Sequence, residues 1–447
     1  MEPSLKEIEK LCKKEIEDNY EAHLKGAQIS LDYLEHSTAK YKGKTIYSLY
    51  IPKIFNTENT KYLKYIAETM VQIMRKVIER YVEDEDYREL FGFSSHLKDL
   101  ILNVPKYDNL LPVARVDIFL NEEDGSFQFC EFNTDGSSAM NEDRELCKAF
   151  EKTQLYEFLN SQYEMSSFEL FDSLAKAFFD IYETYEYKKE NPTVGIVDFL
   201  ELGCSMEEFE QFRLSFEKEG YRAKICDIRE FTFDGQHLID KDGDFIDIVY
   251  RRAVTSDILE HEKQIKPFLN AVMTHKVCCM GSFCTQVAHD KSLFYILRHP
   301  KTTVFLTEEE RCFVEEHIPF TVELTDSTIR DYKVLEEKEK WLIKPKNSYG
   351  ARGIFAGVNF LGKDWKKAVH ENRNKNYILQ KFIMPYQTEN IDFRKKKPVF
   401  TKHSNLTGLY VYNGVFAGVY SRQANHEIIS SAYDENDIAT LTLKERQ

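Results

Sequence analysis

The first hundred residues carry a helical hydrophobic pattern. In the segment Asn59–Asp84 (NTKYLKYIAETMVQIMRKVIERYVED), apolar residues recur every three or four positions, which is the spacing of one face of an α-helix. Asn59 or Thr60 is placed to cap the start of this helix. The pattern predicts a mainly helical region over residues 1–105.

Shortly after this region, the spacing of the apolar residues changes from the helical three or four positions to every second position, as in a strand. VARVDIFL (113–120) and SFQFCEFN (126–133) alternate apolar and polar residues, as paired strands do. Residues 123–125 (Glu-Asp-Gly) fit a three-residue loop, which favours glycine in the left-handed conformation at its last position. Such a loop places Glu122 opposite Ser126.

This register brings four polar side chains together. Asp117 lies opposite Glu131 and Arg115 lies opposite Asn133, all on one face, because strand side chains alternate. Two opposed carboxylates repel each other unless a cation lies between them. Oxygen ligands without histidine or thiolate favour magnesium over zinc. The pattern therefore indicates Mg²⁺ held by Asp117, Glu131 and Asn133, with Arg115 stabilising a transferred phosphoryl group.

Two other interpretations of this hairpin stay open. The polar face can be an exposed one that carries a structural Arg–Asp pair. A two-residue Asp-Gly loop instead places Asp117 and Glu131 on opposite faces.

Strands alternate with helices from about residue 190. Ser205-Met-Glu-Glu208 has the form of a capping box that opens a helix ending at Gly220. This alternation predicts a small, largely parallel sheet with helical cover. The strands are predicted at TVGIVDFL (193–200), RAKICDI (222–228) and FIDIVYRRA (245–253).

A further unit begins near Gly281, after a helix at 265–273. Its predicted elements are helix DKSLFYILRH (290–299), strands TVFLT (303–307), WLIKP (341–345) and YILQKFI (377–383), and the hairpin GLYVYNGVFAGVYSR (408–422). Together with the polar stretch YKKENP before residue 193, these boundaries divide the chain into 1–105, 106–190, 191–280 and 281–447.

The segment after strand 341–345 has the composition of a phosphate-binding loop. Lys344 and Lys346 stand at the strand end, before Ser348, Gly350 and Gly353. Backbone N–H groups in such a loop can surround phosphate oxygens while lysine supplies positive charge. The segment lacks the Walker spacing, and a solvated turn is the alternative.

Other nucleotide candidates lie nearby in the sequence. Lys291 begins helix 290–299, and Gln380 and Lys381 end a strand whose backbone can bind adenine. Arg422 closes the last hairpin and faces either phosphate or the surface. Each of these residues has an ordinary structural alternative, as an exposed side chain or part of a buried strand.

Composition narrows the class of partners. The 447 residues include 60 Lys+Arg and 75 Asp+Glu, a formal net charge of −15, which argues against binding a nucleic-acid backbone. No apolar run approaches the roughly 20 residues of a membrane span. The nine cysteines include no CxxC pair, so we expect reduced thiols and a cytoplasmic protein.

One cluster has the residue types of a zinc site, namely His275, Cys278, Cys279, Cys284 and His289. Its spacing matches no common zinc pattern. KVCCMG also has the pattern of a buried strand, where cysteine behaves as a small apolar residue. Core packing is therefore the favoured interpretation.

Four segments together resemble the circularly permuted ATP-grasp ligases, specifically the glutathionylspermidine synthetase-like group. They are RVD…EFN, the lysine of HDKSLFYIL, LIKPKNSYGARG, and YILQKF followed by GLYVYNGVFAGVYSR. The resemblance covers about residues 90 to 430. It implies an α/β (α+β) chain with a permuted ATP-grasp fold, a pre-ATP-grasp α/β domain at 191–280 and a helical N-terminal region.

The resemblance also implies roles for individual residues. By this resemblance, Asp117, Glu131 and Asn133 bind magnesium, and Arg115 stabilises the transferred phosphoryl group. Lys291 and Lys344 bind the nucleotide phosphates, and Gln380 and Lys381 lie at the adenine hinge. Arg251 and Arg252 lie near the acceptor substrate. The implied activity is an ATP- and Mg²⁺-dependent carboxylate–amine ligase that forms an amide through an acyl phosphate.

The chain departs from the polyamine enzymes of that group. Its loop after Lys344 is not of the glycine–arginine–glycine form, and the chain has no room for the fused amidase domain. The acid and the amine, an amino acid or a polyamine, are therefore left open. A non-catalytic ATP-binding sensor or scaffold is the alternative function, and a glycoside hydrolase using Asp117 and Glu131 is a more distant one.

Overall fold

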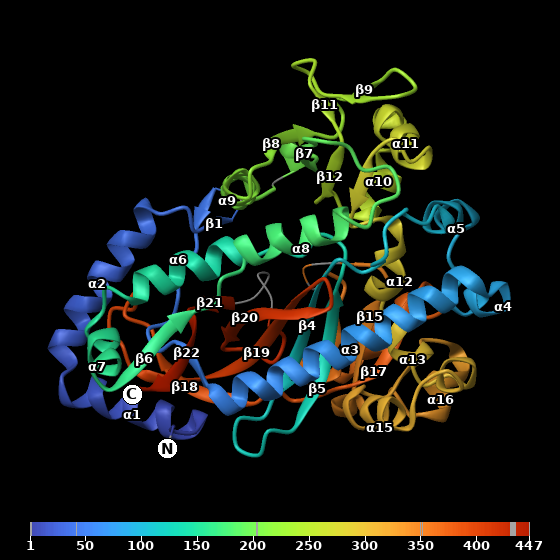
Figure 1. Cartoon of the computed structure of the whole chain (residues 1–447). Coiled ribbons are helices and arrows are strands. Elements are labelled where there is room, and N and C mark those ends of the chain that lie inside the picture. Colours follow the sequence, from blue (N-terminus) through green and yellow to red (C-terminus); the bar gives the residue numbers. More distant parts are fainter. Residues whose placement is uncertain are drawn as a thin grey trace.

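An antiparallel sheet of six strands forms the centre of the computed structural model (Figure 1). The structure describes residues 2–41, 43–202, 204–348, 350, 352–429 and 435–446. The strand order is β21–β20–β19–β4–β5, with β18 paired to β19. The strands are β4 (Val113–Leu120), β5 (Phe127–Asn133), β18 (Gln387–Ile391), β19 (Phe400–Tyr412), β20 (Val415–Ala424) and β21 (Glu435–Ile438).

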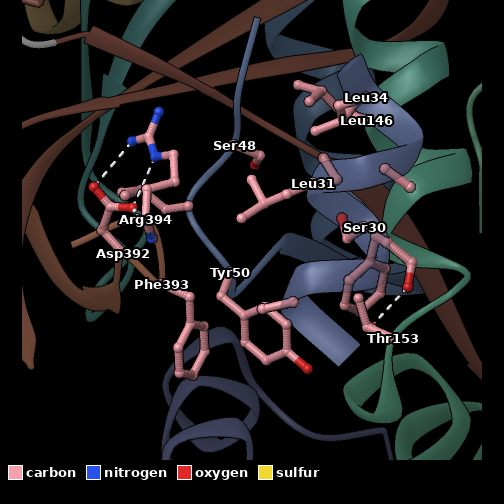
Figure 2. Close-up of a pocket in the computed structure, with 15 residues that line it drawn as sticks. Ser30, Leu31, Leu34, Ser48, Tyr50, Leu146, Thr153, Asp392, Phe393 and Arg394 are labelled. Carbon is pink, nitrogen blue, oxygen red and sulfur yellow. Dashed lines mark hydrogen bonds and ion pairs between the residues drawn. The ribbon is translucent and has the colours of Figure 1, made fainter. Parts of the chain in front are cut away.

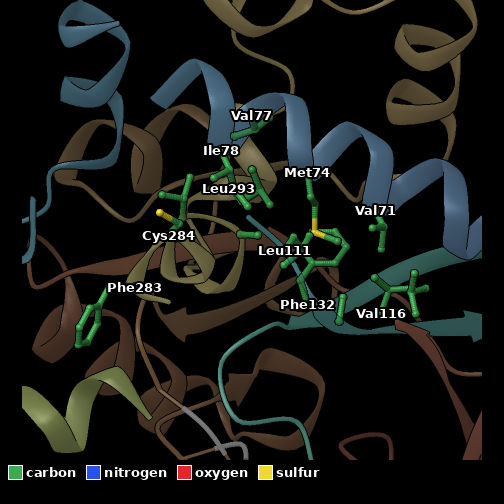
Figure 3. Packing of buried hydrophobic residues seen from close by; sticks show 14 of the residues in the cluster. Val71, Met74, Val77, Ile78, Leu111, Val116, Phe132, Phe283, Cys284 and Leu293 are labelled. Atoms are coloured by element: carbon green, nitrogen blue, oxygen red, sulfur yellow. The ribbon is translucent and has the colours of Figure 1, made fainter. Parts of the chain in front are cut away.

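Helices cover both faces of this central sheet (Figure 1). The long helix α3 (Thr57–Glu83) packs on one face, where Val71 and Met74 lie close to Val116 and Phe132 (Figure 3). On the other face, α6 (Met140–Phe150) contacts β20 and β21, and α8 (Asp172–Tyr182) contacts β19. Alternation along β19 explains the two cores: Leu409 and Val411 belong to the α3 side, Tyr410 and Tyr412 to the α8 side.

The mainly helical N-terminal region is confirmed, with one correction. The cap of α3 is Asn56, whose side chain accepts the Asn59 amide at 2.8 Å, so neither Asn59 nor Thr60 caps it. A small sheet, β3–β22–β6, joins this region to the C-terminal strand. The elements are α1 (Leu5–Asp18), α2 (Tyr20–His36), β1 (Lys40–Tyr41), β2 (Lys44–Thr45), β3 (Lys53–Asn56), α4 (Glu85–Arg88), α5 (Ser95–Leu102), α7 (Gln154–Gln162), β6 (Tyr163–Ser167) and β22 (Thr440–Glu445).

The predicted parallel sheet is confirmed. Its order is β13–β12–β7–β8, with every pairing parallel. The elements are β7 (Thr193–Asp198), α9 (Met206–Lys218), β8 (Arg222–Asp227), β12 (Ile248–Arg251), α10 (Thr255–Glu260), α11 (Lys266–Met273) and β13 (Cys278–Met280). A short sheet of β9 (Thr232–Phe233), β10 (Leu238–Ile239) and β11 (Phe245–Ile246) projects from it (Figure 1).

The predicted capping box at the start of α9 is wrong. Ser205 precedes the helix, but its side chain makes no capping hydrogen bond. Glu208 instead turns inward, where it is fully buried and accepts hydrogen bonds from Arg252 and from the Met140 amide. The Glu208 carboxylate, which a capping box would use at the helix start, therefore binds residues from other elements instead.

A second antiparallel sheet, β14–β17–β15–β16, lies beside the central one (Figure 1). Its strands are β14 (Thr321–Glu323), β15 (Trp341–Pro345), β16 (Phe355–Ala356) and β17 (Tyr377–Lys381). The helices of this region are α12 (Gln286–His289), α13 (Leu293–Ile296), α14 (Pro300–Thr303), α15 (Glu308–His317), α16 (Asp326–Asp331) and α17 (Gly362–Asn372). The 3₁₀ helices of the described chain are η1 (Glu89–Phe91), η2 (Leu200–Leu202), η3 (Glu262–Gln264), η4 (Phe283–Thr285), η5 (Lys338–Lys340) and η6 (Gly357–Asn359).

Two expectations for this region need correction. No strand forms at 303–307, because α14 ends at Thr303 and Thr307 caps α15 in a capping box with Glu310. The helix predicted over 290–299 is regular only in α13. The strand at 341–345 and the hairpin at 408–422 are confirmed, and the strand predicted at 377–383 is confirmed as far as Lys381.

The cysteine cluster belongs to the core. Cys278, Cys279 and Cys284 are buried and carry free thiols. Across the described residues, no group of three or more His, Cys, Asp and Glu side chains is arranged to hold a metal ion. In the same part of the chain, no helix is both long and apolar enough to cross a membrane.

Candidate functional site

The hairpin of β4 and β5 has the predicted register at its polar end. Asp117 pairs with Glu131 and Arg115 pairs with Asn133. The predicted three-residue loop is wrong, because the Asn121 amide donates to the Ser126 carbonyl and leaves four residues between them. A β-bulge between Asp117 and Ile118 in the pairing restores the expected partners.

Asp117 is the centre of a buried ionic network. Its side chain is only 1% exposed, and it accepts Arg115 Nε on Oδ1 at 2.8 Å. Arg422 Nη2 donates to Oδ2 at 2.9 Å, and Asn133 Nδ2 donates to the same oxygen at 3.1 Å. A buried carboxylate is tolerated when it is paired in this way. Asp117 therefore holds two arginines and one amide in fixed positions.

Two lysines converge on Glu131. Lys291 Nζ lies 2.8 Å from Glu131 Oε1 and also donates to the Ser348 carbonyl at 2.7 Å. Lys344 Nζ donates to the carbonyl of the preceding residue, Cys130, at 3.1 Å. Burial alone raises the pKa of the Glu131 carboxyl, but Lys291 and Lys344 outweigh it and lower this pKa from 4.5 to about 2. Glu131 is consequently ionised at neutral pH.

Most of these residues border a cavity of about 550 Å³, whereas Asp117 and Lys291 lie behind its wall and contact it through their partners. It lies between the central sheet and the second sheet, since its wall includes residues of β4, β5, β15, β17 and β20. One part of the wall is largely apolar, formed by Phe119, Phe129, Pro319, Leu342, Phe382, Ile383 and Leu406. Another part is ionic, formed by Arg115, Glu131, Asn133, Lys344 and Arg422. A pocket with apolar and charged parts suits a ligand such as a nucleotide.

The structure separates the predicted loop residues. Gly350 lines the cavity, whereas Ser348 contributes its carbonyl to Lys291. Gly353 has a positive φ of 73° and packs against Tyr377. Tyr349 and Ala351 of the predicted loop lie outside the described residues.

Lys346 does not reach the cavity wall. Strand β15 ends at Pro345, and the Lys346 ammonium forms an ion pair with Glu323 and lies 5.5 Å from the centre of the Tyr295 ring. The hinge residues do line the cavity. Gln380 also donates to Thr321 Oγ1 at 2.9 Å, and Lys381 is exposed.

Arg251 and Arg252 lie behind the cavity, in the interior. Arg251 Nη2 pairs with Asp135 at 2.7 Å, and Arg251 Nη1 donates to the Ala253 carbonyl at 2.7 Å. Arg252 donates to the Ser137 carbonyl and to Glu208. Both arginines thus hold the loop between β5 and α6. Neither arginine lines the large cavity, and their place near an acceptor substrate stays a prediction.

A set of wall residues was not singled out from the sequence. The set comprises Asp135, Glu142, Arg394, Tyr420, Glu435 and Asp437; His289, considered from the sequence only as part of the cysteine cluster, also lines the wall. The only local signal was the position of Asp135 and Glu142 shortly after the EFN segment. Pairing of β21 with β20, which brings Asp437 to the site, depends on the tertiary fold.

A smaller cavity lies between α2, α6 and the loop after β18 (Figure 2). Its volume is about 30 Å³, which is room for water rather than a substrate. Figure 2 shows Arg394 paired with Asp392 beside Tyr50 and Phe393, with Arg394 Nε donating to Asp392 Oδ1 at 2.8 Å. Arg394 also lines the large cavity, so its pairing with Asp392 fixes part of that wall.

The residues fit a magnesium ion held jointly with substrate phosphates. Glu131 and Asn133 line the cavity with oxygen-bearing side chains, the donor type that Mg²⁺ prefers. Asp117 does not line the wall, and both of its oxygens accept protein donors, so its role as a direct ligand stays a prediction. Of the three predicted ligands, only Glu131 brings a carboxylate to the wall, so phosphate oxygens and water would have to complete the coordination of the ion.

Comparison with known proteins identifies the fold. No family model and no curated protein matches the chain. Among solved structures, a glutathione synthetase-like effector from Globodera pallida in its apo form matches with a TM-score of 0.63 and 13% identity, covering 93% of this chain and 96% of that one. The chain therefore has the mixed α/β fold of that protein over nearly its whole length.

Two other solved structures match with lower scores. A putative γ-glutamylcysteine synthetase from Methylobacillus flagellatus KT gives a TM-score of 0.41 and 12% identity, covering 87% of this chain and 89% of that one. A D-cycloserine synthetase gives 0.33 and 13%, covering 57% and 75%.

Gly408 provides a test of the buried network. It pairs with Asp117, and a Cβ at this position lies 2.9 Å from Asp117 Oδ1 and 3.0 Å from Arg115 Cδ. We expect Gly408→Ala to lower the free energy of unfolding by about 1–3 kcal/mol, because a fixed ion pair must move. Denaturant unfolding measures the change.

The matched control is Gly362→Ala at the start of α17, where an added Cβ meets no atom within 4 Å. Its unfolding free energy should change by no more than about 0.5 kcal/mol. Equal losses from both substitutions would contradict the close-packing argument.

The Glu131 ion pair predicts a pH dependence of stability. The folded-state pKa of about 2 lies below the ordinary 4.5, so the pair stabilises the fold above pH 4.5 and this contribution is lost as the pH falls from 4.5 towards 2. We expect Glu131→Gln to show a flatter decrease of unfolding free energy over that range than the wild type.

Denaturant unfolding at a series of pH values measures this decrease. Glu309→Gln, at an exposed position of α15, is the control and should follow the wild type. A Glu131→Gln curve parallel to the wild-type curve would show that the pair does not contribute.

Proposed function

We propose that this chain is an ATP- and magnesium-dependent ligase that activates a carboxylate as an acyl phosphate and joins it to an amine. One observation carries the proposal: Arg115, Arg422, Lys344 and a set of oxygen donors from distant segments line one cavity beside an apolar wall, and Lys291 pairs with Glu131 of that wall. Such a combination matches the needs of phosphoryl transfer, where positioning and electrostatics do most of the catalysis.

The proposed architecture is a circularly permuted ATP-grasp fold. In chain order, β4 and β5 precede the parallel sheet, and the sheet with Lys344 and Gln380 follows it. The parallel sheet is then the pre-ATP-grasp domain. The similarity of the fold to that of a glutathione synthetase-like effector supports this interpretation.

The nucleotide is proposed to lie between the two antiparallel sheets. Its base contacts the apolar wall at Phe129, Leu342 and Leu406, next to the hinge residues Gln380 and Lys381. Its phosphates meet the ammonium groups of Lys291 and Lys344, which lie within reach of Glu131 and Cys130. These lysines supply the positive charge that a polyphosphate requires.

Magnesium, when bound by Glu131, Asn133 and the predicted ligand Asp117, would neutralise charge on the phosphates. Arg115 presents a guanidinium whose orientation is fixed by Asp117 and by the Ser138 carbonyl, to which Nη1 donates at 2.9 Å. This fixed cation orients the substrate carboxylate for attack on the γ-phosphorus. It then stabilises the oxyanion when an amine attacks the acyl carbon.

An ATP-dependent hydroxamate assay tests the function. Hydroxylamine traps an acyl phosphate as a hydroxamate. The enzyme is assayed with Mg-ATP, hydroxylamine and a panel of amino acids and small peptides. With the acids that are substrates, we expect ADP and hydroxamate to form in equal amounts. ADP and hydroxamate are measured in parallel. Magnesium-dependent ATP binding without ADP release for any acid would instead support a non-catalytic module.

Glu131→Gln and Lys344→Met should each lower ADP release on the order of 100-fold, because each removes a charge at the phosphoryl site. Lys340→Met, which changes an exposed lysine directly before β15, is the control and should stay near the wild-type rate. Circular dichroism verifies folding. Near-normal ADP release by Glu131→Gln would remove the basis for the metal assignment.

A further inference from the structure

Three carboxylates line the cavity beyond Arg115. Glu142 lies in the first turn of α6, and Glu435 and Asp437 lie on β21. Arg422 lies opposite Asp437 in the register of β20 and β21, and its guanidinium forms ion pairs with Glu435 at 3.4 Å and with Asp117 at 2.9 Å. The carboxylates therefore border the same space as the proposed phosphoryl site.

Glu142 is buried, and it forms no ion pair with any residue that the structure describes. Glu142 is 5% exposed as a whole residue, and its Oε2 has no hydrogen-bond partner among the described residues. Burial, together with the carboxylates Glu208 and Asp437, raises the pKa of Glu142 well above its ordinary value. Glu208 differs, because Arg252 Nη2 and the Met140 amide donate to it at 3.1 and 2.8 Å.

Asp437 is also short of positive charge. Burial and the neighbouring Glu435 raise the pKa of Asp437 to about 6, although the Tyr420 hydroxyl donates to it and Arg422 and Arg115 lie nearby. Both arginines are held by Asp117. The buried carboxylates at this end of the cavity thus exceed the cations available to them.

The third arginine of this wall is also engaged. Arg394 donates to Asp392 through Nε and Nη2 and to Asn436 at 2.6 Å. Lys44 lines the cavity as well but is exposed to solvent. A buried carboxylate without a partner is costly, and a bound cation removes this cost.

We propose that Glu142 and Asp437 receive the ammonium group of the acceptor substrate, and that one of them takes its proton before the nitrogen attacks. This inference rests on the proposed ligase function and deepens it. The acceptor is then a primary amine that is protonated in solution. Its charge compensates the two carboxylates, and its nitrogen lies beside Arg115, where the acyl phosphate forms.

The proton balance of the reaction supports two carboxylates at this place. An ammonium ion loses one proton to become a nucleophile, and we assign this proton to Glu142 or Asp437. The nitrogen then forms a bond to the acyl carbon, and the carbon–oxygen bond to phosphate breaks with its electron pair leaving on phosphate. The second proton leaves the nitrogen with the phosphate, which yields the amide.

Local charge governs which form the carboxylates adopt. Asp437 faces Glu435 on its own strand, Tyr420 and Arg422 on β20, Arg115 on β4, and the α6 carboxylates Glu142 and Asp143. Glu142 faces Glu208 of α9 and Arg252, which directly follows β12. Binding of an ammonium ion favours the ionised form of both, so it prepares the carboxylate that accepts the proton.

The fold itself does not need the charge of Glu142. A glutamine at this position removes a poorly compensated carboxyl group and keeps the shape of the side chain. We therefore expect Glu142→Gln to melt at the same temperature as the wild type or higher, measured by differential scanning fluorimetry. A large decrease in melting temperature would show a structural role and overturn the inference.

The decisive experiment compares two nucleophiles on Glu142→Gln and Asp437→Asn. Hydroxylamine is largely uncharged at neutral pH and needs no proton acceptor before attack, so both variants should form hydroxamate at close to the wild-type rate. With methylamine, putrescine or glycine as the amine, amide formation should fall on the order of 100-fold, the usual contribution of a general base. Product mass spectrometry measures both.

A matched control is Glu151→Gln, which changes an exposed carboxylate at the other end of α6 and should retain both activities. Equal losses of hydroxamate and amide in Glu142→Gln and Asp437→Asn would overturn the inference, as would normal amide formation by both. Absence of hydroxamate from the wild type with every acid would instead count against the ligase function. The three amines also show whether the site accepts a monocation (methylamine), a dication (putrescine) or a zwitterion (glycine).

Discussion

The buried carboxylate of Asp117 is the interaction on which the candidate site depends. A charge that is removed from water must be matched by close partners, and here those partners come from β4, β5 and β20. The pairing costs desolvation and adds little to stability, but it defines where two guanidinium groups point. Gly408 makes the arrangement possible, since any side chain at that position meets the ion pair.

The rest of the molecule supports this arrangement in layers. Helix α3 packs against one face of the central sheet, and α8 against the other, so the strands that carry the network have little freedom to shift. Arg251, the last residue of β12, and Arg252, which follows it, hold the loop between β5 and α6, and this loop forms part of the cavity wall. In this way the parallel sheet shapes a site to which it contributes few wall residues.

Sequence patterns predicted the local parts of the site well. The alternation in β4 and β5 and the glycine in their loop were enough to pair Asp117 with Glu131, although a four-residue loop and a bulge replaced the expected three-residue loop. Lys346 lies outside the cavity wall and pairs with Glu323, because β15 ends at Pro345. Glu142 and Asp437 were missed because their proximity depends on strand pairing across most of the chain.

The bulge opposite Asp117 also divides the hairpin into a base, which carries Asp117 and Glu131, and a tip, which carries the loop. Between the bulge and the loop, the pairs from Ile118–Phe129 to Leu120–Phe127 form a short regular ladder. A change of loop length by two residues keeps the same side chains inward, because strand side chains alternate with that period. The hairpin tip can therefore diversify between related chains in steps of two residues while the chemistry at its base stays in register.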